Sequence, residues 1–285
     1  MNIIFESYGG IGKVIMSTVI VKKLSQKYPN DKIIVVTGHT SVFKNNPYVT
    51  HLYTPEQRPA INGLHISNKD CKILMKEPYA ENDFILNKHH LLETWCSLYD
   101  LPYSNELPEI FLDSSETEKF KKQLITDKPI MVIHPNGGTV DIDYNWARDL
   151  PFEDVQEIIN KYKDKYTIYH IKSKGQVKYD NVIEETGNVR KVAVLLTLAD
   201  KIITIDTFTQ HLAMALRKPS TVCWVATKPE VFGYNFHDNI LSNPTEFYTP
   251  SNVYCGYNFT EPINNLPYQD PSRIFDVEKI INSIN

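Results

Sequence analysis

The chain has 285 residues, of which 42% are hydrophobic and 22% charged, and it carries a formal net charge of −4. This length and composition fit a folded protein of about two domains and exclude the disordered and fibrous classes. The negative charge gives no general attraction to phosphate backbones and no local basic patch stands out, so the sequence carries no strong nucleic-acid signal.

Strand and helix patterns alternate along the first hundred residues, as in parallel sheets covered by helices. A Gly-rich turn with Gly9, Gly10 and Gly12 separates the first strand from a helix whose apolar residues recur at helical spacing. We expect strands at 3–5, 32–37 and 49–53, helices at 11–24 and 91–101, and a linker at 103–115.

The same alternation restarts after the linker and predicts a second α/β unit. We expect helices at 116–124, 152–162 and 192–198, strands at 130–133, 167–171 and 201–205, and a further helix beginning near Thr207. The tail at 271–284 reads as an amphipathic helix. Ligands bind at the carboxyl ends of parallel strands, so the loops that follow these strands are the candidate site.

The first residues, the apolar runs and the cysteine spacing together indicate an ordinary intracellular protein. Residues 1–10 lack the basic start and apolar stretch of a signal peptide, and no apolar run reaches membrane-spanning length. The four cysteines are scattered and form no C-x-x-C pair, which favours free thiols over a zinc or redox site. We therefore expect a cytoplasmic protein without membrane insertion.

Short motifs for nucleotides and metals give weak signals. The three glycines of the turn lack the spacing of G-x-G-x-x-G, and a P-loop fails because Ser7 replaces its first glycine and Val14 stands where Ser or Thr is needed. The turn keeps only a general affinity for phosphate. Asp141 and Asp143 form a D-x-D pattern, but so short a pattern often arises by chance, and we expect a surface loop there and no metal.

One longer run carries a family resemblance. Asp206–Leu216, followed by Pro219, resembles the D-T/S-G-x-x-H-x-A-A-A-L…P element of glycosyltransferase family 9, the heptosyltransferase-like enzymes. The resemblance implies an α/β chain of the GT-B type, with two Rossmann-like domains whose parallel sheets face a central cleft. It further implies an acceptor-side domain at 1–112, a donor domain at 113–270 and a C-terminal helix at 271–285 that crosses back to the first domain.

The resemblance also implies part of a donor site. In the family, the Asp, the Thr or Ser backbone and the His of this element cradle the donor diphosphate and sugar, which assigns donor contacts to Asp206, Thr207, Phe208 and His211. Phe208 stands where the family has glycine. We expect His211 and the helix N-terminus to favour the diphosphate charge. From the residues alone, Asp206 is equally an N-cap of the helix and His211 a half-buried structural histidine.

Further donor contacts lie in neighbouring loops. Arg148 with Phe152 is similar to the family's K/R-x-W-P-x-x-x-F/W element, whose basic residue reaches the diphosphate; without that context, Arg148 would be a solvated charge. Asn136 and Gly137 follow a strand and complete the expected donor loop. Lys172 follows the next strand, where the family has a donor-contacting acid, but a solvated lysine-rich loop is the alternative we favour.

The catalytic base is the largest open question. Lys13 stands where the family has a catalytic Asp, and a protonated lysine suits a phosphate or acceptor contact but not proton removal. Glu6, directly after the first strand, is our first candidate base, because partial shielding would raise its pKa. His39 is the second candidate. The structural alternative for Glu6 is an ion pair with Lys13.

Two functions therefore stay open. The first is a glycosyltransferase that moves a sugar from a nucleotide-diphosphate sugar to an acceptor hydroxyl, inverting, metal-independent and without a further cofactor. The acceptor is then a glycan, a lipid-linked glycan, a protein side chain or a modified nucleobase. The second is a catalytically silent nucleotide-sugar-binding protein on the same fold, which Lys13 at the base position favours.

Overall fold

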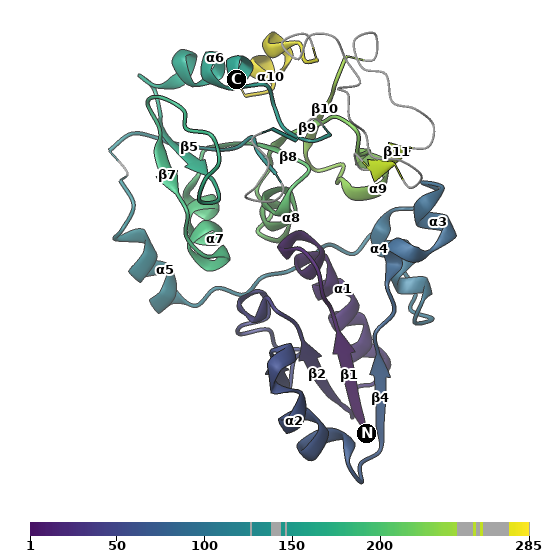
Figure 1. Cartoon of the computed structure of the whole chain (residues 1–285). Coiled ribbons are helices and arrows are strands. Elements are labelled where there is room, and N and C mark those ends of the chain that lie inside the picture. The colour runs from purple at the N-terminus through teal and green to yellow at the C-terminus, as the bar shows by residue number, and fades with distance from the viewer. Residues whose placement is uncertain are drawn as a thin grey trace.

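The computed structural model describes residues 1–125, 127–137, 144–145, 147–243 and 274–284, together with the backbone of two short strands. The chain forms two parallel sheets, each with helices packed on its faces (Figure 1). The expected α/β architecture of the GT-B type is confirmed.

The first sheet contains four parallel strands in the order β3-β2-β1-β4. Its central strand β1 is buried on both faces, as expected for a parallel sheet covered by helices. Its strands are β1 (Asn2–Glu6), β2 (Lys32–Val36), β3 (His51–Tyr53) and β4 (Cys71–Leu74). The helices of this part are α1 (Ile11–Lys27), η1 (Thr40–Val42), η2 (Pro55–Gln57), α2 (Arg58–Ile61), η3 (Asn62–Ile66), η4 (Pro78–Ala80), α3 (Asn82–Ile85) and α4 (Leu91–Ser97).

The second sheet contains six parallel strands in the order β10-β9-β8-β5-β6-β7. Its strands are β5 (Ile130–His134), β6 (Thr167–Ile171), β7 (Ile183–Glu185), β8 (Lys201–Ile205), β9 (Thr221–Trp224) and β10 (Asp238–Leu241). Its helices are α5 (Ser114–Lys121), α6 (Phe152–Tyr162), α7 (Val189–Leu198), α8 (Phe208–Ala215), α9 (Pro229–Phe232) and α10 (Val277–Ile284). Strands β11 (Val253–Tyr254) and β12 (Tyr257–Asn258) form a separate antiparallel pair.

The C-terminal helix is where the predicted arrangement is wrong. We expected it to cross back to the first domain, but α10 packs on α6, β9 and β10 of the second sheet (Figure 1). Its apolar stripe, Ile280, Ile281 and Ile284, lies in the same core cluster as Tyr162 of α6. Burial of that stripe against the nearest apolar surface accounts for the placement.

One continuous apolar core connects the two sheets. It includes Phe5 of β1, most of the buried face of α1, Leu212 of α8 and Val132 of β5. Helix α1 is buried on nearly all sides, because it lies between the first sheet and α8 of the other domain. The two domains are therefore joined by core packing as well as by the linker.

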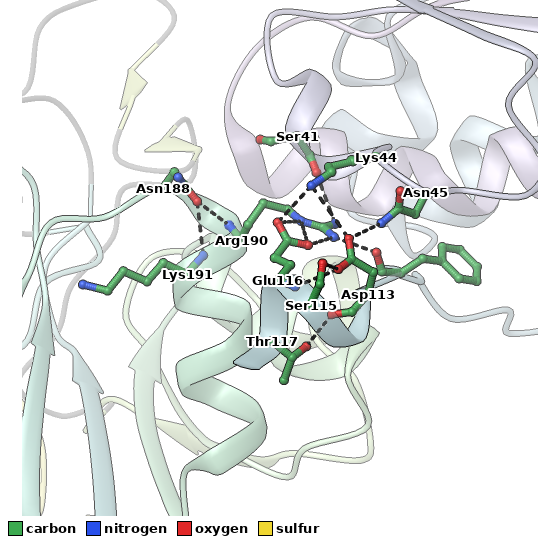
Figure 2. Close-up of polar contacts among 11 residues, drawn as sticks. Ser41, Lys44, Asn45, Asp113, Ser115, Glu116, Thr117, Asn188, Arg190 and Lys191 are labelled. Atoms are coloured by element: carbon green, nitrogen blue, oxygen red, sulfur yellow. Dashed lines mark hydrogen bonds and ion pairs between the residues drawn. The ribbon is translucent and has the colours of Figure 1, made fainter. Parts of the chain in front are cut away.

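A buried polar cluster holds the domains together beside that core (Figure 2). Arg190, in the first turn of α7, donates to both carboxylate oxygens of Glu116 on α5, at distances of 2.5–3.1 Å. Its guanidinium also donates to the carbonyls of Phe111 (2.7 Å) and of Ser41 in the first domain (3.4 Å). Asn188 caps α7 at the backbone N–H of Arg190. This arginine clamp thus joins α7, α5 and η1.

Candidate functional site

The N-terminal ends of α1 and α8 meet between the two sheets. A methyl group added at Gly12, in the first turn of α1, would lie 2.9 Å from Cδ2 of His211 and 3.4 Å from Cα of Phe208. The two N-cap residues, Gly10 and Thr207, make no side-chain capping hydrogen bond in the described part of the chain. Two positive helix ends therefore lie together, which is an arrangement that favours an anion.

Gly12 is needed for this close approach. Gly12→Ala is expected to cost about 1–3 kcal/mol of unfolding free energy, because the added methyl must displace the buried His211 ring or the backbone of α8. Gly10→Ala is the matched control, since nothing lies within 4 Å of a methyl at that position. Urea unfolding of both variants measures the difference. Equal stability of the two variants would contradict the close packing.

Arg148 lies where the two central strands of the second sheet end. Its Nη1 donates to the carbonyl of Asp206, after β8, at 3.5 Å. A methyl added at Gly137, after β5, would lie 3.8 Å from Cδ of Arg148. The structure thus brings Gly137, Arg148, Asp206 and His211 together at the N-terminus of α8.

The Asp206 side chain does not cap α8. Thr207 occupies the N-cap position, and Oδ1 of Asp206 accepts from Nε2 of Gln210 at 3.1 Å. The N-cap interpretation of Asp206 is therefore wrong. Gln210 donates its backbone N–H to the carbonyl of Thr207 at 3.2 Å, and the N-cap side chain leaves the N–H groups of Phe208 and Thr209 without a side-chain cap.

His211 is almost fully buried and neutral. Its Nδ1 lies 2.9 Å from the hydroxyl of Tyr234, and burial lowers its pKa to about 3. At neutral pH the ring therefore offers a hydrogen bond to a ligand but no positive charge, which corrects the expectation that His211 favours an anion by charge. The helix ends and Arg148 supply positive charge that favours an anion here.

Phe208 begins α8, and its ring packs against His134 of β5 at a centroid distance of 5.2 Å. Within the described residues, the non-glycine positions of positive φ do not include Phe208. Phenylalanine therefore fits this backbone, although the family has glycine there. Thr207 donates its backbone N–H to the carbonyl of Ile205 at 2.8 Å.

Asn136 lies beside a cavity. Its side chain bonds Asp149 (3.4 Å) and accepts from the Tyr179 hydroxyl (3.3 Å). The cavity, of about 200 Å³, is walled by Phe152 and Tyr179, whose rings stack at 5.1 Å. Burial raises the pKa of Asp149, and its Oδ1 accepts from the backbone N–H of Gly137. An apolar cavity with one buried carboxamide suits a flat ring system.

Lys172 makes hydrogen bonds to its own loop and to β7. It is buried, and its Nζ donates to the carbonyls of Gln176 (2.8 Å) and Val177 (3.1 Å) and to Glu184 (3.3 Å). The expectation of a solvated lysine is therefore wrong for Lys172. Because these three acceptors match its three donors, the structure gives Lys172 a role in holding the loop after β6.

Glu6 makes its side-chain hydrogen bonds within the first domain. Both of its carboxylate oxygens accept from Arg58, at 2.7 and 2.5 Å, and one also accepts from Tyr8. Burial raises the pKa of Glu6, but the hydrogen bonds from Arg58 and Tyr8 outweigh burial, and the pKa lies below its ordinary value. The expected raised pKa and the expected ion pair with Lys13 are both wrong.

Lys13 pairs with a carboxylate that the sequence patterns did not single out. Its Nζ donates to Glu77, in the loop after β4. His39 lies next to the same turn, where its Nε2 donates to the carbonyl of Gly9 at 3.1 Å. Gly9 has a φ of 101°, which glycine adopts without strain.

Four residues at the site escaped the sequence reasoning, because their partners are far away in the chain. Glu77, Asp149, Tyr234 and Arg58 contact Lys13, Gly137, His211 and Glu6, respectively. Asp149 follows Arg148 within the predicted donor element, whereas the segments of Glu77, Tyr234 and Arg58 carry no motif. For Glu77 the available signal was position, since it stands three residues after Leu74, the last residue of β4.

The described residues provide neither a metal cluster nor a membrane-spanning helix. No group of three or more His, Cys, Asp or Glu able to hold a metal occurs within the described ranges, and Asp141 and Asp143 lie outside them. Of the helices that the structure describes, none has the length and apolar character to cross a membrane.

Comparisons with known proteins identify the fold of the chain. No family model and no curated protein matches the sequence. A family 9 glycosyltransferase from Veillonella parvula has a similar structure, with a TM-score of 0.69 and 12% identity over 99% of this chain and 95% of that one. E. coli ADP-heptose heptosyltransferase II gives a TM-score of 0.67 with 14% identity, over 100% and 98% of the two chains.

A third structure was solved with a nucleotide. E. coli heptosyltransferase WaaC with ADP matches over 100% of both chains, with a TM-score of 0.60 and 15% identity. At such identities structural similarity speaks for the fold and not for activity. The chain therefore has the fold of the family 9 glycosyltransferases and heptosyltransferases, as its sequence motifs suggested.

Proposed function

We propose that this chain is a glycosyltransferase that moves a sugar from a nucleotide-diphosphate sugar to an acceptor hydroxyl, with inversion and without a metal. The observation that carries the proposal is the meeting of two uncapped helix N-termini at Gly12 and Phe208, with Arg148 beside them. Helix ends and an arginine are the groups that bind a diphosphate. The fold shared with nucleotide-sugar transferases supports the same ligand class.

In this proposal each group has a separate task. The first turn of α8 donates backbone N–H groups to the diphosphate, and Arg148 neutralises the charge that grows on it as the sugar leaves. The neutral His211 donates a hydrogen bond. We assign Asn136, which follows β5 in the donor domain, and the cavity beside it to the nucleoside.

A panel of nucleotide sugars, with ADP-heptose first, tests the proposal. A donor that binds the folded state raises the unfolding temperature by mass action, and a transferase also releases nucleoside diphosphate slowly to water. Stabilisation with release supports a transferase. Stabilisation without release, in the presence of any acceptor class, favours the silent donor-binding protein, and no stabilisation by any donor contradicts both functions.

Arg148→Ala is expected to weaken donor binding about tenfold or more. Charge-assisted hydrogen bonds contribute roughly 1.5–3 kcal/mol, and about 1.4 kcal/mol corresponds to a decade in affinity. Lys174→Ala is the matched control, since Lys174 is an exposed cation of the same domain. Calorimetry with the best donor of the panel gives both affinities. A loss below twofold for Arg148→Ala would remove the arginine from the donor site.

A further inference from the structure

We infer that Glu77 is the general base of the proposed transfer, accepting the proton of the acceptor hydroxyl in place of the carboxylate that position 13 lacks. The inference rests on the proposed function. It starts from the ion pair in which Lys13, in the first turn of α1, holds the carboxylate of Glu77.

The fold brings Glu77 to the donor side of the first sheet. Strands β1 and β4 are parallel neighbours, with Phe5 beside Leu74, so the loops after both strands leave the same edge of the sheet. Glu77 lies in the loop after β4, and Gly9 and Gly12 lie after β1. Gly12, which meets His211 and Phe208 of α8, directly precedes Lys13 in the first turn of α1, and Lys13 holds Glu77.

Glu77 is an accessible carboxylate at this edge. Its side chain is 50% exposed, whereas that of Glu6 is 1% exposed and is held by Arg58. One oxygen of Glu77 accepts from Lys13 and the other from the backbone N–H of Tyr79 at 3.3 Å. Each carboxylate oxygen has a further lone pair, so an acceptor hydroxyl can still donate to it.

Lys13 is fixed, which makes it suited to positioning. Its Nζ lies 5.3 Å from the ring centroid of Tyr79 and 5.5 Å from that of Trp95, and its side chain is 9% exposed. Two aromatic faces and one carboxylate therefore hold the ammonium. We assign Lys13 the role of a positioning residue, which orients Glu77 and does not itself take the proton.

The step balances without a further reactant. The acceptor oxygen attacks the anomeric carbon of the donor sugar while its proton passes to Glu77. The bond between the anomeric carbon and the diphosphate oxygen breaks, and the nucleoside diphosphate leaves with the electron pair, next to α8 and Arg148. Water can take the place of the acceptor, which gives slow hydrolysis of the donor by the same base.

Glu77→Gln is the direct test, with release of nucleoside diphosphate from the tightest donor of the panel as the readout and ADP-heptose as the first probe. A positioned general base contributes about 10²–10⁴-fold, so kcat should fall at least a hundredfold while the donor Kd changes less than twofold. Glu93→Gln, on the exposed surface of α4, is the matched control and should keep the wild-type rate.

The double variant Lys13→Met/Glu77→Gln separates a base from a charge partner. If Glu77 only neutralises Lys13, removing both charges restores the rate; if Glu77 takes the proton, the double variant stays as slow as Glu77→Gln. A restored rate, an unchanged rate in Glu77→Gln, or a lost donor affinity in that variant each overturns the inference. So does the loss of turnover in Glu6→Gln or His39→Ala in its place.

The same measurements separate this inference from the proposed function. A wild-type protein that binds no donor overturns the proposed function, and the base with it. A wild-type protein that binds and hydrolyses the donor, with a Glu77→Gln variant of equal rate, supports the proposed function and overturns only the role of Glu77.

Discussion

Arg190→Ala is expected to lower the unfolding free energy by about 3–5 kcal/mol, because it leaves the carboxylate of Glu116 buried without its main partner. The side chains of the two residues are only 4% and 10% exposed. The hydrogen bond from Arg190 is the largest cause of the lowered pKa of Glu116. Removing Arg190 also takes away the hydrogen bonds that it donates to the carbonyls of Phe111 and Ser41.

Two controls belong to this experiment. Lys44→Ala removes an exposed cation that also pairs with Glu116, at 3.4 Å, and should cost no more than about 1 kcal/mol. Arg190→Met/Glu116→Gln removes the charges of both buried partners and should recover most of the loss. Urea unfolding measures all three variants. An equal cost for Arg190→Ala and Lys44→Ala would show that the clamp does not carry the contact between the domains.

The sequence predicted well those elements whose residues are buried on both faces. Strands β1, β2, β5, β6 and β8 occur within a residue or two of their expected ranges, because parallel strands under two helix layers need continuous apolar runs. Strands β4, β7 and β10 were missed, since they are edge strands with exposed positions and no such run. The short strand β9 is buried but was also missed.

Partners across the chain were harder to predict than elements. The motif residues Gly137, Arg148, Asp206 and His211 do come together, since strands that are neighbours in a sheet end at the same edge. The partners of Lys13 and Glu6 come from other segments and carry no local pattern. An ion pair between segments that are distant in the sequence depends on the path of the loops in space. The hydrophobic periodicity of the sequence does not predict that path.

Buried histidines are expected to make the protein unusually sensitive to mild acid. Burial lowers the pKa of His134 and of His211 to about 3, and that of His90, His170 and His237 to about 4. An unfolded chain exposes these rings, whose pKa then returns to its ordinary value of 6.5. The unfolded state therefore binds more protons than the folded state throughout the range between these values.

The direction of the pH dependence of stability follows from the lowered pKa of these histidines. Stability is fully present above pH 6.5 and is lost as the pH falls toward the folded pKa, because protons favour the unfolded state. At pH 5 each of the two rings with the lowest pKa, His134 and His211, should cost about 2 kcal/mol, which is about 1.4 kcal/mol per pH unit for each proton. Together they lower the unfolding free energy by about 4 kcal/mol relative to pH 7.5.

Urea unfolding between pH 7.5 and pH 5 measures this loss for the wild type and for His134→Gln/His211→Gln. The double variant should be less stable at pH 7.5, since it loses the bonds to Thr209 and Tyr234, but its stability should fall less steeply with acid. The difference between the two slopes of unfolding free energy against pH gives the number of protons that the two histidines take up on unfolding, independently of the packing cost of the substitutions. A wild-type stability that stays flat down to pH 5 would contradict the burial of neutral rings, and with it the uncharged His211 of the donor site.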